Sequence, residues 1–436
     1  MTDNGNKQRP VRKLTVDNFS VIKHAELEFG KITVLIGPQA SGKSLLCKLA
    51  FFFQQIVAEQ AEEAIKASED FEQLRQRLID RFSFWFGFDS IATETSKVTL
   101  SMGSYVVSLT LERKGQPGGA RIQWDFSTEF EESYRSVWGK LNAEKMRRES
   151  LPNPKYFAEE IRDRFARLRG QDSPEIYAYI PAARALFLSA HQAIFGTARR
   201  RDDLELRFSQ DFNYGFESRL PKSALDQPLT RWINAESERI LKGRIVPAGS
   251  DFHFKSSEGR TLMLPELSSG TQELLPLMTC LREYVAASAA VAKTLDLPDA
   301  LHKRLFFLEE PETNIFPTSQ NDLVRVFARM SSERALDVYW VITTHSSYIL
   351  SSFNNLIEAS QVSISQPEMK DEVSKLIPEQ FWIKSDDFKA YSIHDGHLES
   401  IMDSETGLIN GAYLDAISNK IGAEFDELLR MGYVKS

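Results

Sequence analysis

The sequence predicts an α/β fold built around a mixed β-sheet, and three stretches of the chain carry this prediction. Each is a short apolar run followed by a polar loop and then a helical pattern, at residues 32–36, 304–309 and 338–344. Strands that alternate with helices in this way form a parallel sheet, whose ligands bind at the carboxyl edge. Residues 14–29 alternate between apolar and polar side chains, which is typical of antiparallel strands. We therefore expect parallel and antiparallel strands in one sheet.

The composition bounds the class of protein. The chain has 436 residues, of which 42% are hydrophobic and 26% are charged, as expected for a globular protein of two or three packed units. No apolar run is long enough to cross a bilayer, and the polar start lacks the apolar segment of a secretory signal. The two cysteines, Cys47 and Cys280, exclude a disulfide framework and argue against a cysteine metal site. We expect a cytoplasmic protein without a membrane partner.

The net charge of −8 argues against a broad surface that coats DNA, although a local basic groove remains compatible with it. The charge run at 199–203 is read either as a solvated face or as a contact with a DNA backbone. Three consecutive phenylalanines at 51–53 are read as core or interface, with base stacking as the alternative.

Residues 37–44 have the pattern G-x-x-x-x-G-K-[ST] between an apolar strand and a helix. Glycine allows the backbone to approach a phosphate chain closely, and the free N–H groups of the loop and of the helix start face that chain. Lys43 would reach the β- and γ-phosphates, and Ser44 would ligate Mg²⁺. The alternative is a glycine-rich turn that only joins a strand to a helix. The predicted phosphate-binding residues are Gly37, Pro38, Gln39, Ala40, Ser41, Gly42, Lys43 and Ser44.

Two later strands end in polar residues suited to the same site. The strand at 304–309 leads into Glu309 and Glu310, of which the first can hold Mg²⁺ and the second can orient or deprotonate water. Adjacent buried carboxylates repel each other unless a cation lies between them, and the alternative is a strand that runs out into solvent. His345 follows the strand at 338–344, where it could hydrogen-bond a γ-phosphate or serve only as a satisfied polar residue.

A second anion site is predicted where a helix begins near residue 269. Ser268, Ser269 and Gly270 would offer free N–H groups, the helix dipole and a serine hydroxyl. An ordinary N-cap is the alternative.

The organisation into domains follows from the positions of these pieces. Residues 1–50 and 243–436 are expected to form the catalytic core, and 51–242 an inserted region with a small antiparallel meander at 97–126. The charged helices of that insertion are too short for a long coiled-coil arm. The insertion would supply the rest of the head and a partner-facing subdomain.

Four segments together resemble the ABC-type ATPase superfamily, in the branch shared by SMC and RecF-like proteins and by the OLD-like "AAA" ATPases of bacterial defence systems. The segments are LTVDNFSVIKHAELEFGKITVLIGPQASGKS, LSSGTQ, LFFLEEPETNIFP and VITTHSSYIL. The stretch YIPAARA also resembles a segment of OLD-like ATPases, which implies a functional Arg184. The resemblance implies a P-loop ABC-ATPase head with a helical insertion.

By position, the resemblance implies that Lys43 and Ser44 bind ATP and Mg²⁺ and that Ser268 contacts the ATP of a second subunit. Glu309 would serve the metal, Glu310 would be the catalytic base, and His345 would sense the γ-phosphate. The chain departs from the family where Ser269 replaces a common glycine, Glu309 a common aspartate, and Asn314 and Phe316 common histidines.

The same resemblance implies an ATPase that forms a homodimer or higher homo-oligomer when ATP binds. The tail shows no acidic pattern of a TOPRIM nuclease domain, so we expect a separate effector, such as a nuclease, in an anti-phage system. The alternative is a DNA-repair or chromosome-associated ATPase that acts on nucleic acid directly. The soluble ATPase of a transporter and a non-hydrolysing scaffold are further alternatives.

Overall fold

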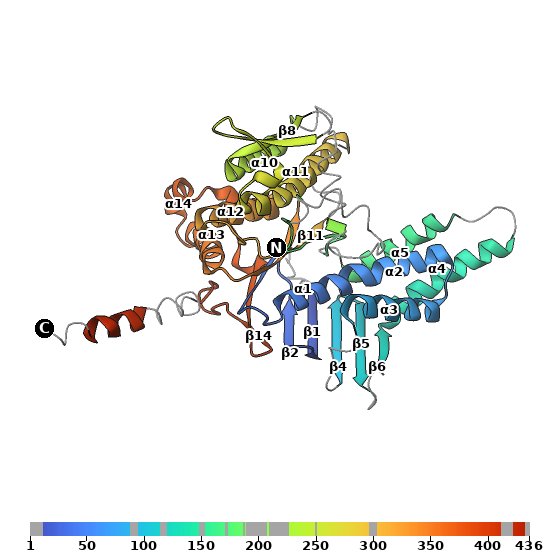
Figure 1. Ribbon diagram of the computed structural model, residues 1–436. Coiled ribbons are helices and arrows are strands. Elements are labelled where there is room, and N and C mark those ends of the chain that lie inside the picture. Colours follow the sequence, from blue (N-terminus) through green and yellow to red (C-terminus); the bar gives the residue numbers. More distant parts are fainter. Residues whose placement is uncertain are drawn as a thin grey trace, which may run out of the picture.

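A computed structural model describes residues 12–87, 95–113, 120–147, 153–170, 173–185, 188, 207–208, 226–248, 251–295, 303–410 and 422–431. Within these residues the chain forms an eleven-stranded mixed sheet, a second sheet of three strands, and helices on both faces of the large sheet (Figure 1). The predicted α/β class with a mixed sheet is confirmed.

The large sheet has the spatial order β6-β5-β4-β1-β2-β14-β13-β3-β12-β11-β7. Its strands are β1 (Arg12–Phe19), β2 (Ile22–Glu28), β3 (Ile32–Ile36), β4 (Ser96–Met102), β5 (Tyr105–Arg113), β6 (Ala120–Phe126), β7 (Ile176–Ile180), β11 (Arg304–Glu309), β12 (Val338–Thr344), β13 (Phe388–His394) and β14 (His397–Ser400). The small sheet consists of β8 (Gly243–Ala248), β9 (Asp251–Ser256) and β10 (Thr261–Met263).

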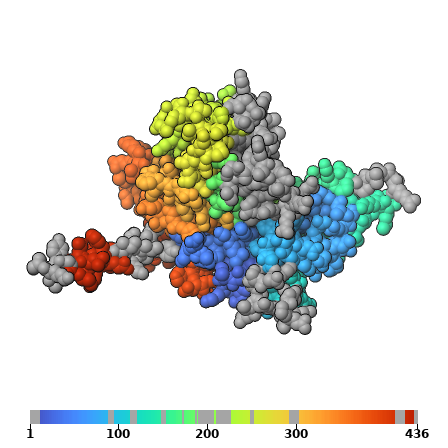
Figure 2. Space-filling model, viewed as in Figure 1, coloured from blue at the N-terminus to red at the C-terminus, as the bar shows by residue number. Residues whose placement is uncertain are grey.

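The longer helices are α1 (Lys43–Phe51), α2 (Val57–Ala67), α3 (Phe71–Phe86), α4 (Thr128–Arg147), α5 (Pro154–Arg169), α10 (Pro228–Leu241), α11 (Ser269–Leu295), α12 (Pro317–Ser332), α13 (Ser347–Ser365) and α14 (Lys370–Leu376). None of the described helices is long and apolar enough to cross a membrane. A further helical segment at 422–431 lies away from the body of the molecule in Figure 2, and all of its side chains are exposed.

Five consecutive parallel strands, β13, β3, β12, β11 and β7, form one end of the large sheet. β3 pairs with β12, β12 with β11, and β11 with β7, all in parallel register. Parallel strands are buried on both faces, which explains why these runs are continuously apolar rather than alternating. Their carboxyl ends therefore meet at one edge, where the sequence places the glycine-rich loop, the two glutamates and His345.

The C-terminal hairpin takes a central place that its position in the chain does not suggest. β13 pairs in parallel with β3, and β14 pairs antiparallel with β13 and in parallel with β2. The hairpin thus separates the N-terminal strands β1 and β2 from the strand that follows them in the chain.

The predicted meander is not a sheet of its own. β4 pairs antiparallel with β1 over six residue pairs, so β4, β5 and β6 extend the edge of the large sheet. β7, which also falls within residues 51–242, pairs with β11 in the parallel part. The expected boundary at residue 50 therefore does not coincide with a break in the sheet. The small antiparallel unit is instead the β8–β10 sheet.

The helix after the glycine-rich loop is widened in its middle. α1 and α2 are joined by one turn of π-helix, Phe52–Ile56, so the helix that the sequence predicts after the glycine-rich loop continues through this turn into α2. Phe51, Phe52 and Phe53 are at most 2% exposed. They pack in the core, which leaves no face free for stacking with a base. Arg12 and Lys13, in the polar start of the sequence, lie in β1.

Other predicted segments fall outside the described residues. These are the glycine-rich turn at 115–119, the charge run at 199–203 and most of the region 193–222. The charged helices expected in the insertion are α4 and α5. They form a hairpin, in which Lys140 and Glu160 make an ion pair of 2.7 Å.

Candidate active site

The loop of residues 37–44 joins the carboxyl end of β3 to the first turn of α1, and we call it the P-loop. Ala40 and Gly42 have left-handed backbone, with φ of 59° and 104°. A Cβ on Gly37 would lie 2.5 Å from the carbonyl oxygen of Ile393 in β13. Any larger residue would therefore push the loop away from the central hairpin, which explains this glycine independently of any ligand.

The side chain of Lys43 occupies the inside of the P-loop. It is buried, and its Nζ donates hydrogen bonds to the carbonyl oxygens of Gly37 at 2.9 Å and Pro38 at 2.8 Å. Burial lowers the pKa of the ammonium group, whereas the carboxylates of Glu310 and Glu312 act in the opposite direction. The lysine thus lies in the field of two carboxylates at the edge of the sheet, although they are far from it in sequence.

The remaining P-loop residues differ in exposure from Lys43. Pro38, Gln39 and Ala40 are exposed, whereas the buried hydroxyl of Ser41 has no hydrogen-bond partner. Ser44 lies in the first turn of α1. An unpartnered hydroxyl and free N–H groups at a helix start suit an anion, because they can donate without competing acceptors.

Glu309 and Glu310 are adjacent in sequence but have different surroundings. The buried carboxylate of Glu309 accepts hydrogen bonds from the hydroxyl of Tyr179 at 2.8 Å and the backbone N–H of Ala182 at 3.3 Å. The side chain of Glu310 is 30% exposed, and its Oε1 lies 3.2 Å from Nε2 of His345. The first carboxylate is fixed by neutral donors, while the second faces the opening of the site.

The backbone at Glu310 adopts a conformation that a residue with a Cβ rarely takes. Its φ is 42°, which costs about 1–2 kcal/mol relative to the right-handed region. Hydrogen bonds with two threonines support this conformation: its N–H donates to the carbonyl oxygen of Thr343 at 2.9 Å, and its own carbonyl accepts from the N–H and hydroxyl of Thr313 at 3.2 and 3.0 Å. Such strain persists where the surroundings determine the geometry, as at active sites.

Glu312 is a third carboxylate of this site, and no function was predicted for it. The backbone N–H of His345 donates to its Oε1, while its buried Oε2 has no partner. Burial raises the pKa of this carboxyl group. The only sequence signal for it was its place in the Glu-Glu-Pro-Glu run. In the structure, its hydrogen bond joins this loop to His345.

Tyr179 was also missed. It precedes Ile180, the last residue of β7, and the alternating pattern of that strand gave no reason to separate it from the core tyrosines. Its hydroxyl orients Glu309, and burial raises its pKa well above the ordinary value, so it remains a donor at neutral pH.

Ser268, Ser269 and Gly270, which we call the signature turn, lie where α11 begins. The two serines are exposed, and the hydroxyl of Ser268 contacts that of Thr271 at 2.9 Å. A Cβ on Gly270 would lie 2.6 Å from the carbonyl oxygen of Asn314, so the turn packs directly against the loop after Glu310. Within the described residues, no hydrogen bond joins the signature turn to the P-loop.

These residues fit a magnesium nucleotide better than a metal held by protein alone. Among the described residues, no group of three or more His, Cys, Asp or Glu side chains has the arrangement of a metal site. Magnesium in nucleotide sites takes one or two protein ligands and completes its shell with phosphate oxygens and water. Ser44 and Glu309 are the residues that would hold it, and Lys43 and the P-loop N–H groups would hold the phosphates.

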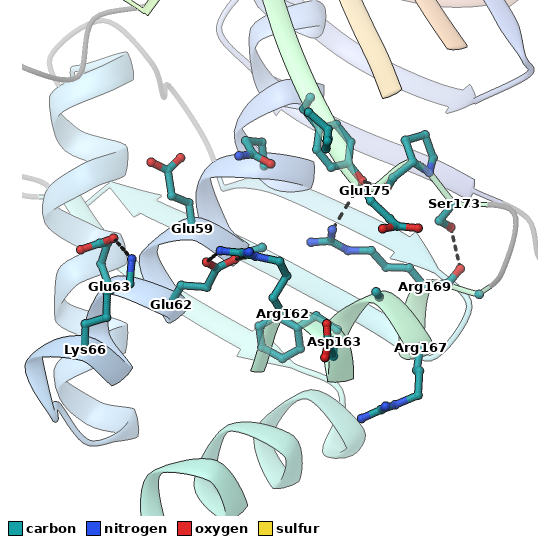
Figure 3. Close-up of a pocket in the computed structure, with 18 residues that line it drawn as sticks. Glu59, Glu62, Glu63, Lys66, Arg162, Asp163, Arg167, Arg169, Ser173 and Glu175 are labelled. Atoms are coloured by element: carbon teal, nitrogen blue, oxygen red, sulfur yellow. Dashed lines mark hydrogen bonds and ion pairs between the residues drawn. The ribbon is translucent and has the colours of Figure 1, made fainter. Parts of the chain in front are cut away.

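A separate cavity of about 960 Å³ lies between α2, α5 and the start of β7 (Figure 3). Charged side chains from both helices line it, and they pair with each other, as Arg162 does with Glu62 at 2.9 Å and Lys66 with Glu63 at 2.8 Å. None of the predicted phosphate-binding or carboxylate residues lines this cavity. The predicted phosphate-binding site is therefore separate from this cavity and lies at the carboxyl edge of the sheet.

A sequence model described as "AAA domain, putative AbiEii toxin, Type IV TA system" matches residues 32–351, which is well over half of the chain. No curated protein sequence matches. Among solved structures, the SMC head domain from Thermotoga maritima is 12% identical, with a TM-score of 0.36, over 90% of this chain and 98% of that chain.

Two further structures show the same degree of similarity. The Smc head domain with an extended coiled coil, derived from Pyrococcus furiosus, is 11% identical with a TM-score of 0.34, over 90% of this chain and 96% of that one. The recombination mediator protein RecF is 12% identical with a TM-score of 0.31, over 90% of this chain and 99% of that one.

Proposed function

The chain belongs to this AAA domain family, and from that premise we propose that it binds ATP with Mg²⁺ and hydrolyses it to ADP and phosphate. The observation that carries the proposal is the meeting of Lys43, Glu310 and His345 at the carboxyl edge of the parallel strands. Glu310 lies 3.2 Å from His345 and within the electrostatic field of Lys43. These residues follow three different strands, and the parallel pairing of those strands brings them together.

Each side chain has a defined function in this proposal. Lys43 and the P-loop N–H groups bind the β- and γ-phosphates, and Ser44 and Glu309 hold the metal. When bound, the ion would neutralise charge on the phosphate oxygens. Glu310 accepts the proton of the attacking water, for which its partly exposed carboxylate is placed at the opening of the site. His345 hydrogen-bonds the γ-phosphate and orients Glu310.

We further propose that ATP brings two copies together head to head, as a dimer or within a higher oligomer. The support is the exposed position of Ser268 and Ser269 at a helix start, which suits an anion. Among the described residues, no hydrogen bond joins these serines to the chain's own P-loop. A second copy's γ-phosphate is the anion that this turn would bind. Exposed Phe316 and Tyr348, at the starts of α12 and α13, would add apolar contact area on the same side.

The cellular output that we propose is control of a separate effector protein, such as a nuclease, in an anti-phage system in the cytoplasm. The support is the family description, which names a toxin of a toxin–antitoxin system. Native mass spectrometry of the tagged Glu310→Gln chain, expressed with its genomic neighbours and held in ATP and Mg²⁺, tests this. We expect a second protein in a fixed ratio, and a chain that purifies alone under these conditions contradicts the proposal.

The alternative is an ATPase that acts on nucleic acid directly, in DNA repair or on chromosomes. The α4–α5 hairpin, which projects from the body in Figure 1, carries exposed Lys145 and Arg147 near its tip. ATP turnover measured with and without duplex and single-stranded DNA separates the two functions. Stimulation of severalfold favours the alternative, and no stimulation favours control of a protein effector.

A further inference from the structure

Arg184 is the most completely enclosed charged residue near the candidate active site. It is 0% exposed and follows β7 in the turn after Pro181. All three guanidinium nitrogens donate to backbone carbonyl oxygens: Nε to Glu273 at 3.1 Å, Nη1 to Glu309 at 2.8 Å, and Nη2 to Glu310 at 2.9 Å. Its side chain therefore binds the peptide carbonyls of Glu309 and Glu310 and leaves their carboxylates to other partners.

The charges around Arg184 explain why an arginine can be buried there. Four carboxylates act on it, namely those of Glu273, Glu309, Glu310 and Glu312. A buried cation is costly unless opposite charges and hydrogen bonds compensate for its lost hydration. A lysine could not replace it, because the ammonium group is a point charge without the planar fork that reaches three separate carbonyls.

The hydrogen bond from Arg184 to Glu310 is made to the residue whose backbone is strained. The carbonyl oxygen of Glu310 accepts from Arg184 as well as from Thr313, and its residue has the left-handed φ of 42°. If Arg184 moved, the peptide plane that aims the Glu310 carboxylate would lose one of its supports. The orientation of the proposed base thus depends on the position of Arg184.

The bond to Glu273 connects this point to the signature turn. Glu273 lies in the first turns of α11, three residues after Gly270, and its carboxylate Oε2 is 3.5 Å from Nε of Arg184. The same helix start also packs against Asn314, in the loop after Glu310. The start of α11 therefore contacts the loop after Glu310 directly. Through Arg184 it is also connected to the peptide group of Glu310.

We propose that Arg184 is a positioning residue that links the signature turn of one subunit to the catalytic base of that same subunit. The inference rests on the proposed ATP-dependent assembly. When the second copy's γ-phosphate binds the signature turn, α11 shifts, and Glu273 and Arg184 transmit the shift to the peptide of Glu310. Each site then reaches its active geometry only when the partner's site is filled, so turnover is cooperative in ATP.

The test compares the full-length chain with its Arg184→Lys, Glu273→Gln and double variants. Turnover is measured against ATP concentration, and binding is measured with a fluorescent ATP analogue. For the wild type we expect a Hill coefficient above about 1. For Arg184→Lys we expect kcat to fall by roughly 10²-fold, as for a small displacement of a catalytic group, with the Kd of the analogue within about twofold. Its Hill coefficient should fall to about 1.

The double variant and a matched control complete the design. Arg184 and Glu273 act as one unit in the proposal, so the effects of their two substitutions on kcat should be clearly less than additive. Arg169 is a second buried arginine, outside the site, which donates to the carbonyl of Gln54 at 3.0 Å. Arg169→Lys should lower thermal stability but leave the Hill coefficient and the kcat of folded protein unchanged.

The outcomes separate this inference from the proposed function. A wild-type chain without ATP turnover contradicts the proposed function itself. Cooperative wild-type turnover with unchanged kcat and Hill coefficient in Arg184→Lys overturns the inference alone. If Arg184→Lys does not fold, Glu273→Gln decides: a Hill coefficient that stays at the wild-type value rejects the link, and one that falls to about 1 supports it.

Discussion

At the scale of single residues, the candidate site contains more carboxylates than cationic side chains. Glu309, Glu310 and Glu312 lie within one loop, and Lys43 and Arg184 are the cations in their field. Carboxylates this close destabilise the folded chain unless a cation compensates for them. Lys43 and Arg184 thus compensate part of this negative charge, and the proposed metal ion would compensate more of it.

Removal of the ammonium group of Lys43 should abolish nucleotide binding in this arrangement. In Lys43→Ala the phosphates lose their only proposed side-chain cation in the P-loop, and we expect turnover to fall by roughly 10²–10³-fold. Steady-state phosphate release and binding of a fluorescent ATP analogue measure this. A variant that keeps wild-type turnover would place the ATP site elsewhere, and a wild type without turnover would favour a non-hydrolysing scaffold.

Glu312 gives a prediction about pH. Burial raises the pKa of its carboxyl group, so the folded chain binds this proton more tightly than the unfolded chain does. The free energy of unfolding therefore falls as pH rises from the ordinary glutamate pKa through the raised folded value. Without nucleotide, Glu312→Gln should increase Tm at pH 8 by roughly 1–4 °C, because it removes a buried charge.

The same variant should lose its advantage in acid, where Glu312 of the wild type is protonated. Thermal unfolding of both chains between pH 4.5 and 8 checks this expectation. A stabilising effect that does not shrink toward pH 4.5, or a lower Tm at pH 8, would show that the charge of Glu312 is not the cause. The matched control is Glu258→Gln, because Glu258 is exposed in the turn after β9.

At the scale of elements, the π-helical turn between α1 and α2 carries aromatic side chains into the core. Phe52 in that turn packs against Phe82 and Phe86 of α3 and Trp124 of β6, with ring centroids 5.4, 5.6 and 6.3 Å away. These partners belong to the region expected to be an insertion. One aromatic cluster therefore joins the P-loop helix to the meander.

Shortening Phe52 tests whether the two regions fold together. Phe52→Ala leaves a large cavity in this cluster, and we expect the free energy of unfolding to fall by about 3–5 kcal/mol. We also expect one cooperative transition, seen by circular dichroism and tryptophan fluorescence alike. Two separated transitions in the wild type would instead support residues 51–242 as an independent domain. Phe84→Ala, at a half-exposed position of α3, is the control.

At the scale of the whole molecule, the proposed second copy completes a site that one chain leaves open. The signature turn is exposed at the start of α11, and the carboxylate and histidine loops lie at the carboxyl edge of the central strands. ATP would then act as part of the contact between two heads, and its hydrolysis would release them.

Glu310→Gln should trap this contact. The amide keeps the shape of the side chain but cannot accept the proton of water, so turnover should fall by roughly 10²–10⁴-fold while ATP binding persists. Size-exclusion chromatography with light scattering should show a dimer or larger assembly in ATP and Mg²⁺ and a smaller species in ADP. A Glu310→Gln chain that stays monomeric in saturating ATP contradicts the proposed assembly.

Much of the fold could be read from local patterns. Continuous apolar runs located β3, β11 and β12, and alternation located β1 and β2. The P-loop, the glutamate pair and His345 were located because each combines a special residue type with the end of a strand. The positions of Tyr179, Glu273 and Arg184 in the site were not derivable in this way, because their importance lies in contacts across more than 80 residues of chain.

By itself, the sequence predicted many of the elements of this protein and the residues that would bind phosphate, because helix and strand periods and glycine spacing are local properties of the chain. Only the tertiary structure decided that β13 lies between β14 and β3, that the meander continues the main sheet, and that Arg184 joins α11 to Glu310. Strand order and buried charge contacts depend on long-range packing. Many arrangements satisfy the same local pattern, and the burial of the whole chain selects one of them.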